Sequence, residues 1–145
     1  MIEGKAGLDS RTVLVSVATG KVQADVECAP NEYRDMHTSP NGDWNVIGGS
    51  IISPDHKITC VGGRDGEKTV TLIGATDDGR AFGYTENPLG SGQGEPVFVD
   101  VRPGQDPKTE DLANDVTIPA GILDGNLGVH WNPSTGALSA NPVQN

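Results

Sequence analysis

The residues best placed to do chemistry are acids that stand beside glycines. The stretch VGGRDGEKTVTLIGATDDGRAFGY, residues 61–84, carries Asp65 near one end and Asp77 and Asp78 near the other. Carboxylates grouped on loops are the ligands that Ca²⁺ prefers. Neither GGRDGE nor TDDGR has the acid spacing of an EF-hand loop, however, and Asp and Gly are also what a tight hairpin turn selects. We therefore predict that these acids make turns and bind no metal.

Transition-metal chemistry needs histidines and cysteines that converge. The chain offers two cysteines and three histidines, and none is spaced as Cys-x-x-Cys or His-x-x-x-His: Cys28, Cys60, His37, His56 and His130. Each cysteine ends a strand-like run, VQADVEC or KITC, where a small buried thiol fits well. We expect two reduced cysteines in the core, with a disulfide as the alternative.

No catalytic constellation is visible in the sequence. GSGQG at 90–94 has the wrong spacing for a Gly-x-Ser-x-Gly nucleophile elbow, and no helix follows it. GGRDG and GSGQG both feed apparent strands, whereas a phosphate-binding loop feeds a helix. Twenty acids always include some pair that could hydrolyse a sugar, but two Trp, two Tyr and two Phe leave few platforms for sugar rings. We predict a non-enzymatic protein with no catalytic, cofactor-binding or metal-binding residues.

Length and charge exclude further classes. A chain of 145 residues fits one domain with a real core, so we predict a single domain over 1–145. Ten basic residues stand singly among twenty acids, giving a net charge of −10, so no basic patch is available for nucleic acid. No apolar run reaches the ~18 residues of a membrane helix. Residues 1–5, MIEGK, lack the layout of a secretory signal, so we expect synthesis and folding in the cytoplasm.

The clearest element is a hairpin over Arg11–Ala18 and Lys21–Cys28. The second run alternates strictly, which is typical of a half-buried antiparallel strand. We predict buried side chains at Val22, Ala24, Val26 and Cys28, and exposed ones at Gln23, Asp25 and Glu27.

The rest of the chain also favours strands. We predict two helical segments at most, a turn near Glu32–Met36 and a short helix in PGQDPKTEDLAND, residues 103–115, capped by Asp106 with Pro107 at its first position. Residues 86–96 form a loop, and residues 1–10 and 132–145 are extended polar ends. The remaining predicted strands are Asp43–Ile52 with a glycine bulge or bend, His56–Val61, Glu67–Thr76, Arg80–Thr85, Pro96–Arg102, Asp115–Pro119 and Gly125–Trp131.

About eight or nine short strands separated by regular turns indicate an all-β, antiparallel β-sandwich. A jelly-roll arrangement is our first expectation, and an immunoglobulin-like sandwich or a small closed barrel is the alternative. Trp44 and Trp131 each stand near a strand end, in GDWN and HWNP. We predict that both cover the core, whereas exposed tryptophans would mark a contact surface.

In size, in its β-rich Gly/Thr/Val composition and in its extended ends, the chain resembles the head decoration, or cement, proteins of tailed bacteriophages. The resemblance implies a structural protein on the outer capsid surface of a virion, made in the host cytoplasm. Its partners would be the major capsid protein, or another protein lattice, and copies of itself in a dimer or trimer, with no nucleic acid, membrane or cofactor. The alternatives are a ligand-binding β-sandwich, such as a carbohydrate-binding or lectin-like module, and a small hydrolase with a carboxylate pair. Exposed side chains at Trp44 and Trp131 would favour the lectin-like module, whereas buried tryptophans with apolar loops and flat edges would favour the structural protein.

Overall fold

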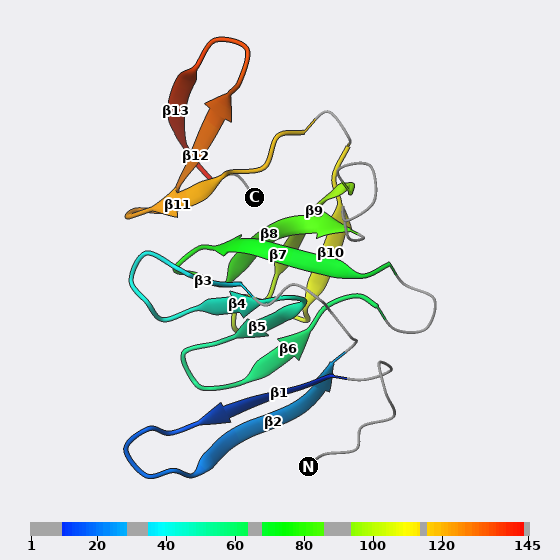
Figure 1. Cartoon of the computed structure of the whole chain (residues 1–145), viewed down its shortest axis with the longest axis vertical. Helices are drawn as coiled ribbons and strands as arrows, with labels where there is room; N and C mark the ends of the chain where they lie inside the picture. Colours follow the sequence, from blue (N-terminus) through cyan, green and yellow to red (C-terminus); the bar gives the residue numbers. More distant parts are fainter. Residues whose placement is uncertain (1–9, 29–34, 64–67, 86–93, 114–115, 144–145) are drawn as a thin grey trace.

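The structure is a computed structural model that describes residues 10–28, 35–63, 68–85, 94–113 and 116–143 (Figure 1). This part of the chain holds thirteen strands in four antiparallel sheets and no helix, so the predicted all-β, sandwich-like class is confirmed. The first sheet is β1 (Ser10–Val15) and β2 (Val22–Cys28), and the second is β3 (Met36–Thr38), β4 (Asn45–Ile47), β5 (Ser50–Ile52) and β6 (Ile58–Cys60). The third is β7 (Val70–Ala75), β8 (Arg80–Thr85), β9 (Pro96–Asp100) and β10 (Lys108–Asp111), and the fourth is β11 (Gly121–Leu123), β12 (Leu127–Asn132) and β13 (Ala137–Pro142).

The four sheets follow one another along the longest axis of the molecule, from β1–β2 at one end to β11–β13 at the other (Figure 1). Within each sheet, neighbouring strands are consecutive in the chain. These sheets are therefore meanders, without the Greek-key crossings from which a jelly roll is built.

The main core lies between the second and third sheets. The largest fully buried apolar side chains, Val46, Ile51, Leu72, Val97 and Val99, all belong to it. A smaller cluster around Cys28, Ile52 and Ile58 joins the first sheet to the opposite side of the second. Because β5 is buried along its whole length, the second sheet carries apolar side chains on both faces.

The predicted hairpin is confirmed as β1–β2, and its alternation holds over most of its length. Gln23, Asp25 and Glu27 are exposed, while the side chains at 24 and 26 are half-buried and Cys28 is buried. The exception is Val22, which is 60% exposed. The register shifts between Leu14 and Val15, so that Val22 stands opposite the exposed Val15. Such a β-bulge changes which face a residue occupies, and Val22 therefore leaves the buried face.

Residues 43–52 were predicted as one strand, and this prediction is wrong. They form the hairpin β4–β5, with Ile47 paired to Ser50 across the two-residue turn Gly48-Gly49. Gly48 has a φ of 53°, which a two-residue hairpin turn favours. The paired glycines therefore mark a reversal of the chain instead of a bulge in a continuous strand.

The helix predicted within 103–115 is also wrong. Gly104 turns the chain with a φ of 84°, and Lys108–Asp111 then pairs with β9 as the edge strand β10. A short capped segment gains little as an isolated helix, whereas pairing satisfies the open edge of β9. Of the turn predicted near Glu32–Met36, residues 32–34 lie outside the described residues, and Met36 begins β3.

The other middle strands were predicted with nearly correct bounds. Arg80–Thr85 is β8 as predicted, and β6, β7 and β9 are shorter than predicted by one to three residues at an end. Asp65-Gly66 and residues 86–93 lie outside the described residues, so these two predictions are untested.

The C-terminal region differs most from expectation. The described part of Asp115–Pro119 forms no strand, whereas the unpredicted β11 precedes β12. The segment expected as a polar end, 132–145, supplies most of the hairpin β12–β13 through residue 142. The turn residues NPSTG were interpreted as the start of a tail, but they reverse the chain and return it along β12.

Candidate binding surface

The turn acids connect neighbouring turns. The carboxylate of Asp77 accepts a hydrogen bond from the backbone N–H of Asn41 at 2.9 Å, and its own N–H donates to Asn126 Oδ1 at 2.8 Å. Asp78 pairs with the buried Arg80, Nε to Oδ1 at 3.0 Å, and accepts from Thr76. Asp77 and Asp78 thus hold turns together, as predicted from their Asp-Gly setting, and Asp65 lies outside the described residues.

A second carboxylate–guanidinium pair lies beside the first. Asp100 is opposite Arg80 on the adjacent strand and binds Arg102, with Nη2 to Oδ2 at 2.6 Å and Nε at 3.0 and 3.1 Å from the two oxygens. The hydrogen bonds from Arg102 lower the pKa of Asp100 against an opposing effect of burial. Burial raises the pKa of Asp78, but the hydrogen bonds from Arg80 and Thr76 outweigh it and leave the pKa lowered. All four charged groups are satisfied, which is the pattern of a structural network.

Arg80 also anchors the end of the chain. Its Nη1 donates to the carbonyl oxygen of Val143 at 3.2 Å, just beyond β13. The N–H of Val143 donates in turn to the carbonyl oxygen of Asn126 at 3.0 Å. The fourth sheet is therefore fastened to the third by buried and partly buried polar contacts.

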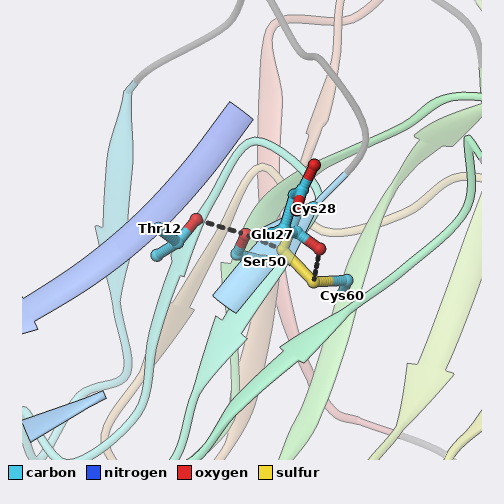
Figure 2. Close-up of a disulfide and its surroundings, with 5 residues drawn as sticks. All are labelled: Thr12, Glu27, Cys28, Ser50 and Cys60. Carbon is cyan, nitrogen blue, oxygen red and sulfur yellow. Dashed lines mark hydrogen bonds between the residues drawn. A yellow bond between two sulfur atoms is a disulfide. The ribbon is translucent and has the colours of Figure 1, made fainter. Parts of the chain in front are cut away.

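Cys28 and Cys60 form a disulfide, so the prediction of two reduced cysteines is wrong (Figure 2). The bond joins β2 to β6 and closes a separation of 32 residues. Ser50 Oγ donates to Cys28 Sγ at 3.3 Å and lies 3.1 Å from Thr12 Oγ1, so β1, β2 and β5 meet at this point. The carbonyl oxygen of Glu27 lies 3.7 Å from Cys60 Sγ, but a disulfide sulfur has no proton to donate, so this is a van der Waals contact.

The two tryptophans have opposite environments. Trp44 is 4% exposed and packs over Gly79, where an added Cβ would lie 2.7 Å from the ring. It covers the core as predicted. Trp131 is 51% exposed on β12, so the same prediction is wrong for it. By the criteria set from the sequence, the exposed Trp131 marks a contact surface and favours the ligand-binding module, whereas the buried Trp44 favours the structural protein.

Trp131 belongs to a sheet face that carries no polar side chain. Leu138 lies directly opposite Trp131, and pairing with alternation places the following residues on one side of β11–β13, here called the apolar face: Gly121, Leu123, Leu127, Val129, Trp131, Leu138, Ala140 and Pro142. Leu123 is 52% exposed and Leu138 is 69% exposed.

The opposite face of this sheet is turned toward the body of the protein. Ile122 lies 3.7 Å from the position that a Cβ on Gly74 of β7 would take, and Gly128 lies against Pro119. His130 and Asn141 share this inner face and line a cavity of about 350 Å³ beneath Phe82 and Phe98. A one-sided antiparallel sheet normally turns its apolar side inward and its polar side to water. All six residues of β13 are exposed, so both faces of the sheet are open along this strand, and on the apolar face Trp131 also borders a hollow of about 1030 Å³ that Ile73 and Tyr84 line.

A second group of exposed apolar residues lies at the other end of the molecule. The outer side of the hairpin β1–β2 and its connecting turn carry four exposed valines, of which the one in the turn is fully exposed: Val13, Val15, Val17 and Val22. The disulfide holds this hairpin to β6.

The described residues contain no group of three or more His, Cys, Asp or Glu side chains that could hold a metal ion. They also contain no helix long and apolar enough to cross a membrane. The predictions of no cofactor and no catalytic residue stay predictions.

The apolar face is the feature that the sequence reasoning missed. Its signal was present, because Leu127, Val129 and Trp131 alternate with small and polar residues, and Leu138, Ala140 and Pro142 do the same after the turn. Because residues 132–145 were interpreted as a tail, the matching alternation of residues 127–131 and 138–142 was not recognised.

Comparisons with protein-family models, curated proteins and solved structures gave no match. The roles of these residues rest on their own contacts and chemistry.

Proposed function

We propose that this chain is a non-enzymatic structural protein that attaches to a protein lattice, in the manner of a capsid decoration protein. The observation that carries the proposal is the apolar face of β11–β13, where Trp131 and Leu138 are each more than half exposed. Contiguous apolar patches of this kind mark protein interaction sites. The exposed valines of β1–β2 add a second contact at the opposite end, which suits a protein that bridges two subunits.

The charge and the disulfide support the same proposal. A net charge of −10 keeps the protein off packaged nucleic acid and soluble despite its apolar face. The bond between Cys28 and Cys60 suits oxidising surroundings, which include virion surfaces. The major capsid protein of a tailed bacteriophage is the lattice that we propose as partner.

The test is co-sedimentation of the purified protein with particles isolated from the source of its gene. The protein should travel with the particles, and the double variant Trp131→Ser/Leu138→Ser should remain in the supernatant. Met36→Ser is the matched control, because Met36 is 62% exposed but lies on β3, outside both apolar groups. Equal attachment of all three proteins, or no attachment of the unmodified one, would contradict the proposal.

A ligand-binding β-sandwich is the second candidate, and the inner cavity favours it. About 350 Å³ lined by Phe82, Phe98 and other apolar groups, with Glu110, His130 and Asn141 at its wall, has the composition of a small-molecule site. Trp131 borders a larger open hollow of about 1030 Å³ nearby. Titration with monosaccharides, followed by tryptophan fluorescence, tests this candidate. Saturable quenching that is lost in Trp131→Ser would favour it over lattice attachment.

A further inference from the structure

Strand β13 has an open edge. It pairs with β12 on one side only, all six of its residues are exposed, and ALSANP contains no charge. The edge strand β10 of the third sheet, by contrast, is exposed and carries Lys108, Glu110 and Asp111, whereas the edge strands β3 and β11 are uncharged but only three residues long. Charged side chains of this kind prevent edge-to-edge pairing. The edge of β13 lacks that protection, although it is one of the longest strands.

The hydrogen bonds on the closed side determine which groups face the open side. The N–H of Val143 donates to Asn126, so by antiparallel alternation residues 137, 139 and 141 also direct their backbone groups toward β12. Leu138 and Ala140 therefore direct their N–H and C=O groups outward. Pro142 offers a carbonyl only, because it has no N–H.

We propose that β13 pairs with β13 of a second copy, in antiparallel orientation, to form a symmetric dimer. The register that uses every outward N–H places Leu138 opposite Ala140 of the second copy and Ala140 opposite its Leu138. Four backbone hydrogen bonds result, and the two-fold axis passes through Ser139. Strand addition at an open edge is a common mode of recognition, and a two-fold axis makes the contact self-complementary.

The charge distribution makes this edge the place where a second copy meets the least repulsion. Each copy has a net charge of −10, but residues 116–143 contain a single charged residue, Asp124. Two copies therefore meet with least repulsion through this region. The two-fold axis is perpendicular to the joined sheet, so both apolar faces lie on the same side and form one continuous surface of six strands. The dimer goes beyond lattice attachment and does not depend on it.

Single cysteine variants test the register. Both native cysteines are in the disulfide, so an introduced thiol is the only free one. In Ser139→Cys, each new thiol faces its symmetry mate across a non-hydrogen-bonded pair about 4.5 Å apart at Cα, within disulfide range. Asn141→Cys is the matched control on the same face of the same strand, because its mate would lie about 13 Å away.

Mild oxidation should give a covalent dimer of Ser139→Cys on a non-reducing gel. The amount of this dimer should be at least tenfold greater than that of the Asn141→Cys dimer. Equal cross-linking of the two variants, or none of Ser139→Cys, would overturn the proposal. Adding Ala140→Pro to Ser139→Cys removes only an outward N–H, so cross-linking should fall while the melting temperature stays similar. If that variant does not fold, the comparison of the two single variants decides alone. Particle attachment is measured separately, so a missing dimer leaves the proposed function standing.

Discussion

At the scale of residues, two buried and two partly exposed charged side chains form a network whose contacts are structural. Asp78, Arg80, Asp100 and Arg102 form two adjoining ion pairs whose partners also act on each other. Arg80 extends the network to Val143. The four side chains connect the β8–β9 region to the end of the chain, and they leave no charged group unmatched.

Acid should weaken this network at a defined pH. The pKa values of Asp78 and Asp100 are lowered in the folded protein, so their stabilising contribution is complete above the unfolded value of about 3.9. It is lost as the pH falls through the folded values, because the unfolded chain then binds protons more readily. Urea unfolding should give a constant contribution from these groups between pH 5 and 7, and a loss below about pH 4.

Removing one carboxylate tests whether these ion pairs stabilise the folded protein. Asp100→Asn should lower the free energy of unfolding at pH 7 by about 1–3 kcal/mol and reduce the loss in acid. Asp43→Asn removes the same charge at an exposed turn and should change neither by more than about 0.5 kcal/mol. Identical urea profiles for the two variants would show that the ion pairs contribute nothing.

Gly83 is required by a close backbone approach. The register of β7 and β8 shifts between Leu72 and Gly74, and a Cβ on Gly83 would lie 2.0 Å from the carbonyl oxygen of Thr71. Gly83→Ala should therefore destabilise the protein by about 3 kcal/mol or more, measured by urea unfolding. Gly121→Ala is the control, since nothing lies within 4 Å of its Cβ position. A similar free energy for both variants would contradict the crowding at Gly83.

At the scale of elements, the disulfide determines how the hairpin β1–β2 is held. Its apolar contacts with the second sheet are few, centred on Cys28, Ile52 and Ile58. Reduction, or the double variant Cys28→Ala/Cys60→Ala, should cost about 2–4 kcal/mol and lower the melting temperature by roughly 10 °C. Calorimetry with and without reductant measures this. No change on reduction would mean that the hairpin is held by packing alone.

The sequence predicted local elements wherever one pattern dominated. The alternation at 22–28 and the Asp-Asp-Gly turn before Arg80 gave the right strands, because side-chain period and turn chemistry are local properties. The sequence did not predict the structure of segments whose conformation depends on the strand that pairs with them. Lys108–Asp111 has an acceptable helical start but pairs with β9, and residues 137–142 resemble a tail until β12 is opposite them. The disulfide was only the alternative expectation, because chain spacing does not show that residues 28 and 60 meet.

At the scale of the whole molecule, the two apolar groups lie at opposite ends of the longest axis (Figure 1). Neither group is needed by the described core, which lies between the second and third sheets. Two weak contacts on one rigid body bind a repeating lattice by avidity, because the second contact forms at a high effective concentration. A bridging protein therefore needs modest apolar surface at each end and a stable connection between the ends.

This arrangement predicts how attachment should respond to damage at either end. Val17→Ser in the first hairpin and Leu138→Ser in the fourth sheet should each weaken particle binding in sedimentation titrations. The expected loss of affinity is 10-fold or more and can reach ~10²–10⁴, because each variant damages one of the two contacts that avidity requires. Both side chains are exposed, so melting temperatures should stay within a few degrees of the unmodified protein. Deleting 132–145 is a poorer test, because it removes β13 and the anchor at Val143. If Val17→Ser binds normally while Leu138→Ser does not, only the C-terminal sheet attaches, and the bridging arrangement is wrong.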